Sequence, residues 1–344
     1  MLNAIIQTTL LDDVFREDPT TNSLEEYMAS LFGHPSALLV LSGTMGNQLA
    51  LRAHLHSPPH SVLADYRGHI VEYEAGGVCS LSQAMVYPVI PANGRYLTLA
   101  DIQRTAVLST DVHKCPTRVI SLENTIGGAV IPLAECQAIA AWARAHDIRM
   151  HLDGARIWEA VASQVAEGGY SGSFEAGLQA YAECFDSVQA CFSKGLGAPM
   201  GSILVGQAAF IDKARHVRKA IGGGMRATGI IAAPAKVAVE ETFLGGKLAN
   251  THVMAKMIAG WWEERGGKLQ RPVETNMVWL DLAASEVGEE EFGETGEREG
   301  IQVRGGGRVV CHYQICDEAL EGLERVIEQV LVRKGEKEAN RHRP

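Results

Sequence analysis

The chain has 344 residues, of which 46% are hydrophobic and 21% charged, and these proportions are ordinary for a globular protein with a sizeable core. Its formal net charge of −10 argues against a surface that binds nucleic acid or anionic lipid. No apolar run reaches the ~18 residues of a membrane span, and no basic segment precedes the short apolar stretch at the N-terminus. We therefore expect a cytoplasmic protein that acts on a small molecule.

The first predicted elements are an N-terminal arm over residues 1–20, a helix over 23–32 and a buried strand over 37–41. Ser23 and Glu26 have the spacing of a capping box, and Gly33 is placed to end the helix. A Gly-rich turn follows the strand and leads into a helix that reaches His54. We expect the arm to precede a large domain over residues 21–240.

The middle of the chain alternates strands with a helix. Residues 117–123, 148–153 and 187–192 are typical of buried strands, and residues 133–146 carry apolar side chains at helical spacing. This alternation predicts βαβ units in an α/β fold: a mostly parallel sheet with helices on both faces. Ligands of such sheets bind beyond the carboxyl ends of the strands.

The order of predicted elements changes in the C-terminal part, and we expect a small α+β domain over residues 241–344. A long helix is predicted over 229–264, with breaks at Pro234 and at Gly245-Gly246. Strands are expected over 276–282 and 309–315, an acidic loop and surface helix over 285–300, and an amphipathic helix over 317–332.

Cysteine and histidine positions do not predict a metal site. The seven cysteines are scattered without a C-x-x-C pair, which favours reduced thiols. His54, His56 and His60 surround a Ser-Pro-Pro stretch that is typical of a solvated turn after a helix. We predict that no metal is bound.

Lys194 stands in a Ser-Lys-Gly turn directly after a predicted buried strand. Partial burial lowers the pKa of a lysine, so that its neutral amine can form a Schiff base with a carbonyl compound. Ser193 offers a hydroxyl group to a phosphate. A surface lysine in an ordinary loop is an equally good interpretation of this turn alone.

Asp153 ends the preceding predicted strand and is followed by Gly154 and, two residues later, Arg156. An aspartate against a pyridine nitrogen keeps that nitrogen protonated, which pyridoxal 5′-phosphate (PLP) requires to act as an electron sink. Arg156 suits a substrate carboxylate, because a guanidinium group binds it in bidentate fashion. The alternative is a plain Asp-Gly turn.

Residues 42–47, Ser-Gly-Thr-Met-Gly-Asn, connect the predicted strand 37–41 with the next helix. Backbone amides at a helix N-terminus bind phosphate, and small residues allow it to approach. Gly43, Thr44 and Met45 are the expected phosphate ligands. The motif is neither a Walker A loop nor a dinucleotide-binding fingerprint.

Together these features make the chain similar to the threonine aldolases of the aspartate-aminotransferase-like PLP fold (fold type I). The resemblance extends from Asp12 almost to the end of the chain, and its motifs are the acidic segment at 12–20, Glu-Ala-Gly-Gly within 72–77, Leu-Glu-Asn-Thr at 122–125, Asp-Gly-Ala-Arg at 153–156, Ser-Lys-Gly at 193–195 and Gly-Gly-Gly-Met-Arg at 222–226.

The resemblance implies a role for each matching position. Lys194 would carry the cofactor, Asp153 would pair with its ring nitrogen, and His69 would stack on the ring. Arg156 and Arg308 would bind the substrate carboxylate. The cofactor-binding set implied is Gly43, Thr44, Met45, His69, Asp153, Ser193, Lys194 and Arg226, the last from a loop that would reach a neighbouring subunit of a homodimer or homotetramer.

Two departures from the family pattern bear on the activity. No Arg-Ser-Asp-Thr segment precedes Asp12, so Gln7, Thr8 or Thr9 substitutes for its serine or that substrate contact is lost. Ile126 stands where many bacterial members have a histidine near the substrate hydroxyl, as an apolar residue does in fungal-type members. The base is then His69 or a water molecule that it orients.

Three functions remain open at this stage. The first is cleavage of L-threonine or L-allo-threonine, or a related β-hydroxy-α-amino acid, to glycine and an aldehyde. The second is racemisation of an amino acid such as alanine by the same cofactor. The third is a catalytically weak relative with a role in assembly or binding, against which the presence of Lys194, Asp153 and Arg156 argues.

Overall fold

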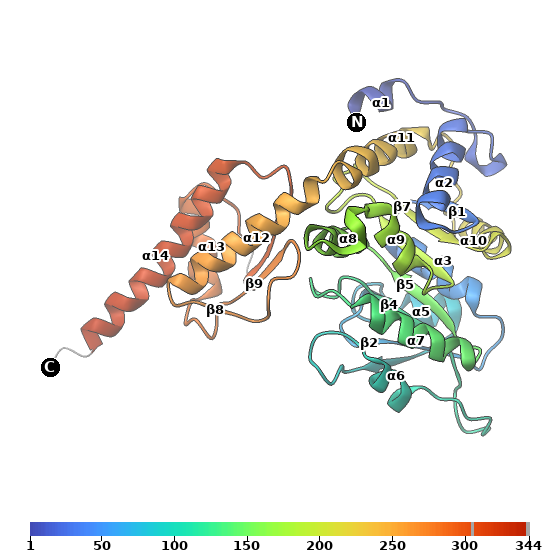
Figure 1. Ribbon diagram of the computed structural model, residues 1–344, viewed down its shortest axis with the longest axis horizontal. Helices are drawn as coiled ribbons and strands as arrows, with labels where there is room; N and C mark the ends of the chain where they lie inside the picture. The colour runs from blue at the N-terminus through green and yellow to red at the C-terminus, as the bar shows by residue number, and fades with distance from the viewer. Residues whose placement is uncertain (304–305, 342–344) are drawn as a thin grey trace. The chain divides into compact units, whose positions relative to one another are not determined.

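The computed structural model describes residues 1–303 and 306–341, with side chains to residue 331 (Figure 1). The chain forms two compact units. The larger contains residues 1–126 and 130–246, and the smaller contains residues 127–129 and 247–344. In the part of the chain described, no helix is both long and apolar enough to cross a membrane.

A seven-stranded sheet forms the centre of the larger unit. Its strands in sequence order are β1 (Ser36–Val40), β2 (Ser61–Asp65), β3 (Met85–Val89), β4 (Thr117–Glu123), β5 (Arg149–Asp153), β6 (Ser187–Cys191) and β7 (Ser202–Gly206). In space the order is β1-β7-β6-β5-β4-β2-β3. The neighbours from β6 to β3 are parallel, whereas β7 runs antiparallel to both β1 and β6. The predicted mostly parallel sheet is confirmed.

The register of β7 brings two distant segments together. Ser202 lies opposite Val40 on one side and opposite Cys191 on the other. The carboxyl ends of β1 and β6 therefore lie at the same edge of the sheet, two strand spacings apart. The turn after β1 and the turn that carries Lys194 start from these two ends.

Helices cover both faces of the sheet. On one face, α3 (Gly43–His54) and α10 (Ala208–Ala220) pack on β1 and β7 through a core that includes Leu38 and Leu204. The other face is covered by α2 (Pro19–Phe32), α7 (Leu133–Ala145), α8 (Ile157–Ala166) and α9 (Phe174–Ala182), where Trp158 contacts Phe32 edge to face. The shorter elements of this unit and its last helix are α1 (Leu2–Ile6), η1 (Asp13–Phe15), α4 (His69–Glu72), α5 (Gly77–Ser82), α6 (Leu99–Thr105), η2 (Gly169–Gly172), α11 (Gly229–Ala238) and η3 (Val239–Leu244).

The start of α2 differs from the prediction. The helix begins at Pro19, and the side chain of Asp18 caps it by accepting a hydrogen bond from the Thr21 amide at 2.8 Å. Proline at the first helical position is favoured, since its missing amide would have no acceptor there. The predicted capping box at Ser23 is wrong, because Ser23 lies inside the helix on its exposed side.

The smaller unit has its own core. It contains α12 (Lys247–Glu264), α13 (Glu289–Arg298), α14 (Asp317–Arg341) and an antiparallel sheet in the order β10-β9-β8, formed by Arg308–Val310, Met277–Asp281 and Lys268–Leu269. Trp262, Val278 and Phe292 are among its buried residues. Residues 127–129 join this unit through hydrogen bonds from Thr275 Oγ1 to the Gly128 carbonyl at 3.0 Å and from Trp279 Nε1 to the Gly127 carbonyl at 2.8 Å.

Two further predictions in this region need correction. Pro234 does not break the helix but lies within α11. Because proline has no amide hydrogen, the carbonyl of Ile230, four residues earlier, loses its donor, and Ile230 is exposed in the first turn of the helix. The break comes at Gly245-Gly246, as predicted. The strand expected over 309–315 ends at Val310, and the chain then turns, with the Ile315 amide bonded to the His312 carbonyl at 3.0 Å.

Candidate functional site

The candidate site lies at the carboxyl edge of the large sheet. Glu123 ends β4, Asp153 ends β5, and Lys194 follows β6 by three residues. The N-terminus of α3 enters the same edge after β1. A small cavity there is lined by Ala64, Asp65, Gly68, His69, Ile70, Ser121, Leu122, Glu123 and Asp153.

Asp153 is buried and held by two donors. Its Oδ2 accepts a hydrogen bond from Asn47 Nδ2 at 2.7 Å, and its Oδ1 accepts one from the Ala155 amide at 3.0 Å. Each carboxylate oxygen has two lone pairs, so both oxygens can accept a further donor. The arrangement suits the predicted role of Asp153 toward a protonated ring nitrogen.

His69 is joined to the same group of side chains. It begins the short helix α4, and its Nδ1 lies 2.7 Å from Oε1 of the buried Glu74. Asn47 Nδ2 donates to that oxygen as well, at 2.8 Å. Ligand atoms of His69, Glu74 and Asp153 lie within 4.8 Å of one another. The hydrogen bond to Glu74 raises the pKa of His69, the Asp153 charge adds to the rise, and the Lys194 charge opposes it.

Glu123 is a second acid beside Asp153. Burial raises the pKa of Glu123 to about 8, with a further rise from the Asp153 charge, while the Lys194 charge acts in the opposite sense. Its Oε2 accepts the backbone amide of His69 at 2.8 Å. Lys194 is half-buried. Lys194 follows β6, the strand beside β5, so its turn starts at the same edge of the sheet as Asp153 and the neighbouring His69.

The N-terminus of α3 is the turn that is predicted to bind phosphate. The Ser42 side chain caps the helix by accepting from the Met45 amide at 3.2 Å, and the Gly46 amide bonds to the Ser42 carbonyl at 3.1 Å. The two remaining first-turn amides, those of Gly43 and Thr44, are the ones a helix leaves for an anion. The Met45 amide already has an acceptor in Ser42, and the role of Met45 in cofactor binding stays a prediction.

The residues fit a bound PLP group. A Cβ atom at Gly43 would lie 2.6 Å from Nε2 of Gln189, and one at Gly46 would lie 2.6 Å from Cγ of the same residue. Gln189 is fully buried below this turn, and within the described chain neither polar atom of its side chain has a hydrogen-bond partner. A close-packed turn beside the unpaired Oε1 and Nε2 atoms of Gln189 suits a phosphate-bearing ligand, because buried polar atoms normally have a hydrogen-bond partner.

The other predicted residues are placed as follows. Ser193 is exposed and lies 3.3 Å from Cys191 Sγ, and Arg156 precedes α8 directly after the Asp153 turn. Arg226 is exposed and pairs with Asp12 of the N-terminal arm. Arg308 belongs to the smaller unit, where its guanidinium lies 5.7 Å from the ring centre of Trp279. The predicted pairing of Arg156 with Arg308 and the reach of Arg226 to another subunit stay predictions.

Several polar residues of this site received no role from the sequence: Asn47, Glu74, Glu123, His151 and Ser187. Asn47, Glu74 and Glu123 stand within motifs that the sequence analysis quotes, and the position of Glu123 at the end of a parallel strand could have indicated a site residue.

The Ser-Pro-Pro stretch predicted as a solvated turn is exposed, but two of the three histidines around it are not. His60 is buried, with Nε2 2.9 Å from the Ser82 carbonyl. His54 is partly buried, and its Nε2 lies 2.7 Å from Ser187 Oγ.

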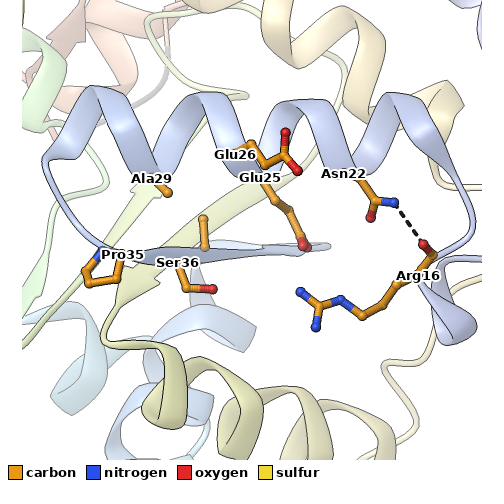
Figure 2. Close-up of a pocket in the computed structure, with 8 residues that line it drawn as sticks. Arg16, Asn22, Glu25, Glu26, Ala29, Pro35 and Ser36 are labelled. Atoms are coloured by element: carbon orange, nitrogen blue, oxygen red, sulfur yellow. Dashed lines mark hydrogen bonds between the residues drawn. The ribbon is translucent and has the colours of Figure 1, made fainter.

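A larger cavity lies elsewhere, between α2 and the start of β1. It is lined by Arg16, Asn22, Glu25, Glu26, Ala29, Pro35, Ser36 and Ala37. Figure 2 shows Glu25 and the guanidinium group of Arg16 facing the same space. The Glu25 carboxylate is already satisfied by Arg215 at 2.6 Å and by the Leu39 amide at 2.8 Å. No predicted cofactor or substrate residue lines this cavity, so its size does not mark the chemical site.

Most of the chain is similar to known enzymes. A family model described as beta-eliminating lyase matches residues 1–285. An aldolase of Penicillium aethiopicum, vrtJ, is 53% identical over 96% of this chain and 83% of its own. Alanine racemase TOXG of Cochliobolus carbonum is 43% identical over 96% and 84%. A low-specificity L-threonine aldolase of Eremothecium gossypii is 45% identical over 95% and 83%.

Two solved structures share the fold. A threonine aldolase of Leishmania major superposes with a TM-score of 0.79 at 19% identity and covers 96% of this chain and 95% of its own. A serine palmitoyltransferase of S. paucimobilis with bound PLP superposes with a TM-score of 0.72 at 17% identity and covers 97% and 82%. The predicted fold type I is confirmed.

Proposed function

Because the chain belongs to the beta-eliminating lyase family, we propose that it is an aldehyde-lyase that cleaves L-threonine, L-allo-threonine or a related β-hydroxy-α-amino acid to glycine and an aldehyde. The observation that carries the proposal is the meeting of Lys194, Asp153 and His69 at one edge of the sheet, beside the N-terminus of α3.

The cofactor is pyridoxal 5′-phosphate, as the family and the PLP-bound structures with this fold indicate. When bound, it supplies an electron sink that stabilises negative charge at Cα of the substrate. Lys194 would hold it through its amine, and the Gly43 and Thr44 amides, with Ser193, would bind its phosphate. Asp153 would keep a proton on the ring nitrogen, and His69 would stack on the ring.

The substrate is oriented through its carboxylate. Arg156, placed directly after the Asp153 turn, supplies a guanidinium group for it, and Arg308 is the second group proposed. Fixing the carboxylate would hold the substrate in one orientation, so that one bond to Cα is presented for cleavage. His69, or a water molecule that it orients, removes the proton from the β-hydroxyl group as the aldehyde leaves.

The names of two relatives support cleavage of the Cα–Cβ bond. Two of the three relatives described above are named as aldolases, one of them as a low-specificity L-threonine aldolase. The buried apolar Ile126 at the end of the Leu-Glu-Asn-Thr motif removes one candidate base but leaves His69 in place. The proposal therefore needs no group beyond those already at the site.

The test is a substrate panel. The protein, reconstituted with PLP, is incubated with L-threonine, L-allo-threonine and L-alanine, and acetaldehyde, glycine and D-alanine are quantified. Acetaldehyde and glycine in equal amounts, lost in Lys194→Ala, support the aldehyde-lyase. A PLP-loaded protein that leaves all β-hydroxy-α-amino acids of the panel intact overturns it.

One observation favours a second function, racemisation of alanine: the 43% identity to alanine racemase TOXG. The same site would remove the Cα proton in place of the aldehyde. D-Alanine formed from L-alanine at a rate above that of threonine cleavage supports this alternative, and its absence on chiral chromatography rejects it.

The protein is further proposed to act as a homodimer or homotetramer in the cytoplasm. Leu2, Ile6 and Phe15 of the N-terminal arm are 77%, 80% and 68% exposed, an apolar surface that a second copy would cover. All seven cysteines are free thiols, which suits a reducing compartment.

A further inference from the structure

A continuous row of hydrogen bonds runs from the end of α3 to the Asp153 carboxylate. His54 Nε2 lies 2.7 Å from Ser187 Oγ, and Ser187 Oγ lies 2.8 Å from His151 Nδ1. His151 Nε2 lies 3.1 Å from Asn47 Oδ1. The two amide hydrogens of Asn47 then reach Asp153 and Glu74.

The fold explains why these residues meet. Asn47 and His54 are seven residues apart on α3, so they lie on one face of the helix. His151 and Asp153 are two residues apart on β5, so their side chains project from the same face of the strand, toward α3. Ser187 on β6 is the register partner of His151. Asn47, His151, Ser187 and Asp153 are all at most 4% exposed.

The position of each hydrogen in the row is determined by its neighbours. Burial lowers the pKa of His151 to about 3, and that of His54 to about 3, so both rings are neutral. A neutral His151 has one hydrogen, and Asn47 Oδ1 can only accept, so Nε2 donates and Nδ1 accepts from the Ser187 hydroxyl. The Ser187 oxygen then accepts from His54 Nε2.

The consequence is a fixed orientation for the Asn47 amide. If the amide were reversed, its oxygen would face two carboxylates, and His151 and Ser187 would both have to reverse their hydrogens. In the observed orientation, Asn47 donates both to Asp153, which is proposed to face the ring nitrogen, and to Glu74, which is bonded to His69. Donors aligned head to tail in a buried site also polarise one another.

We propose that Asn47 is a positioning residue that sets Asp153 and the Glu74–His69 pair in place together, and that the buried row His54–Ser187–His151 holds its amide in the required orientation. This inference rests on the cofactor roles proposed for Asp153 and His69. Asn47 does not touch the cofactor itself, because it acts through the two carboxylates.

The experiment uses the full-length protein stripped of PLP and titrated with PLP. Three quantities are measured: the dissociation constant of PLP, the pH at which the absorbance of the bound cofactor changes, and the urea midpoint of the apo-protein. Asn47→Leu and His151→Leu are expected to weaken PLP binding about tenfold and to shift the pH profile. His151→Gln, whose side-chain amide can still donate to Asn47, is expected to restore most of the affinity.

His60→Leu is the matched control for His151→Leu. His60 is also a buried histidine, but it lies directly before the start of β2, and its Nε2 is 2.9 Å from the Ser82 carbonyl, away from the row. We expect its PLP affinity to change less than about threefold and its pH profile to stay in place. An equal loss in His60→Leu would show a general effect of removing buried polar groups and would overturn the inference.

Two further outcomes separate the inference from the proposed function. If Asp153→Asn leaves PLP affinity and the pH profile unchanged, the proposed role of Asp153 fails. If Asp153→Asn changes both but the Asn47 and His151 variants lower only the urea midpoint, the row is purely structural and the inference alone fails. Should Asn47→Leu not fold, Ser187→Ala, which removes one oxygen atom, tests the same row and is expected to shift the pH profile in the same direction.

Discussion

Asp153 shows how burial and hydrogen bonding prepare a single side chain for its proposed task. It is 4% exposed, and two donors, Asn47 Nδ2 and the Ala155 amide, hold its carboxylate before any ligand arrives. A pre-oriented group costs little reorganisation when the substrate reacts. Loss of its charge should therefore reduce catalysis more than it reduces folding.

We predict that Asp153→Asn lowers kcat at least about a hundredfold, because the ring nitrogen loses the acid that keeps it protonated. Steady-state kinetics with saturating PLP measure the effect. Asp186→Asn is the control, since Asp186 is bonded to Arg149 and to the Met150 amide at the opposite edge of the sheet. A loss of less than threefold in Asp153→Asn would contradict the assignment.

Glu123 gives a prediction for stability against pH. Its pKa is raised from 4.5 to about 8 by burial, so its contribution to stability is full below pH 4.5 and is lost as the pH rises through about 8. Between pH 5 and pH 8.5 the apo-protein should lose roughly 4 kcal/mol more stability than Glu123→Gln, at about 1.36 kcal/mol for each pH unit between the two pKa values. Urea unfolding at both pH values measures the difference, and parallel curves for the two proteins would refute it.

At the scale of the element, the turn between β5 and α8 depends on a close approach of two strands. The Gly154 amide donates to the Gln189 carbonyl at 2.7 Å, and a Cβ atom at Gly154 would lie 2.7 Å from that same oxygen. Only glycine fits there without moving β5 against β6. Gly154 therefore sets the distance between β5, which ends at Asp153, and β6, which precedes Lys194.

Gly154→Ala should destabilise the protein by about 2 kcal/mol, since backbone must shift to admit the methyl group, and should weaken PLP binding. Thermal unfolding and PLP titration measure the two effects. Gly260→Ala in α12 is the matched control: a Cβ there has no atom within 4 Å, and alanine favours a helix. Its unfolding temperature should stay the same or rise, and equal losses in both variants would contradict the argument.

The start of α2 allows a second prediction at this scale. Asp18 is fully buried and accepts hydrogen bonds from Thr9, Leu11 and Thr21, so it joins the N-terminal arm to the helix. Asp18→Ala should cost about 2 kcal/mol in urea unfolding and should expose the arm to proteolysis. Ser23→Ala, the residue with the capping-box spacing, should change stability by less than about 0.5 kcal/mol. The reverse ranking would restore Ser23 as the cap.

At the scale of the whole molecule, the larger unit contains the proposed cofactor residues, whereas Arg308, a proposed substrate residue, belongs to the smaller unit. The N-terminal arm adds an exposed apolar surface to the larger unit, with Leu2, Ile6 and Phe15 among its side chains. An exposed apolar patch commonly marks contact with another chain, and we expect these side chains to form part of one.

We predict that the double variant Ile6→Glu/Phe15→Glu lowers the mass of the assembly, because four charged atoms of two carboxylates cannot be buried there without partners. Light scattering coupled to size-exclusion chromatography measures the mass. Val112→Glu, at a position that is 93% exposed in a loop, should leave the mass unchanged. An unaltered mass in the double variant would place the interface elsewhere.

The sequence alone determined the class of fold and the outline of the chemistry. The buried strands of the large sheet can be predicted from the local pattern of apolar residues. The bounds of β4, β5 and β6 therefore lie within a residue of the predicted ones. Lys194, Asp153 and the Gly-rich turn before α3 are recognisable because each follows a strand end, where a parallel sheet presents its ligand site.

Only the tertiary structure decided which buried polar groups work together. Asn47, Glu74, His151 and Ser187 come from four separate segments, and each looks unremarkable within its own. The antiparallel β7, with Ser202 opposite both Val40 and Cys191, brings the turn before α3 beside the turn of Lys194. Local pattern could not reveal this, because hydrogen-bond partners in a buried site are chosen by long-range packing rather than by spacing along the chain.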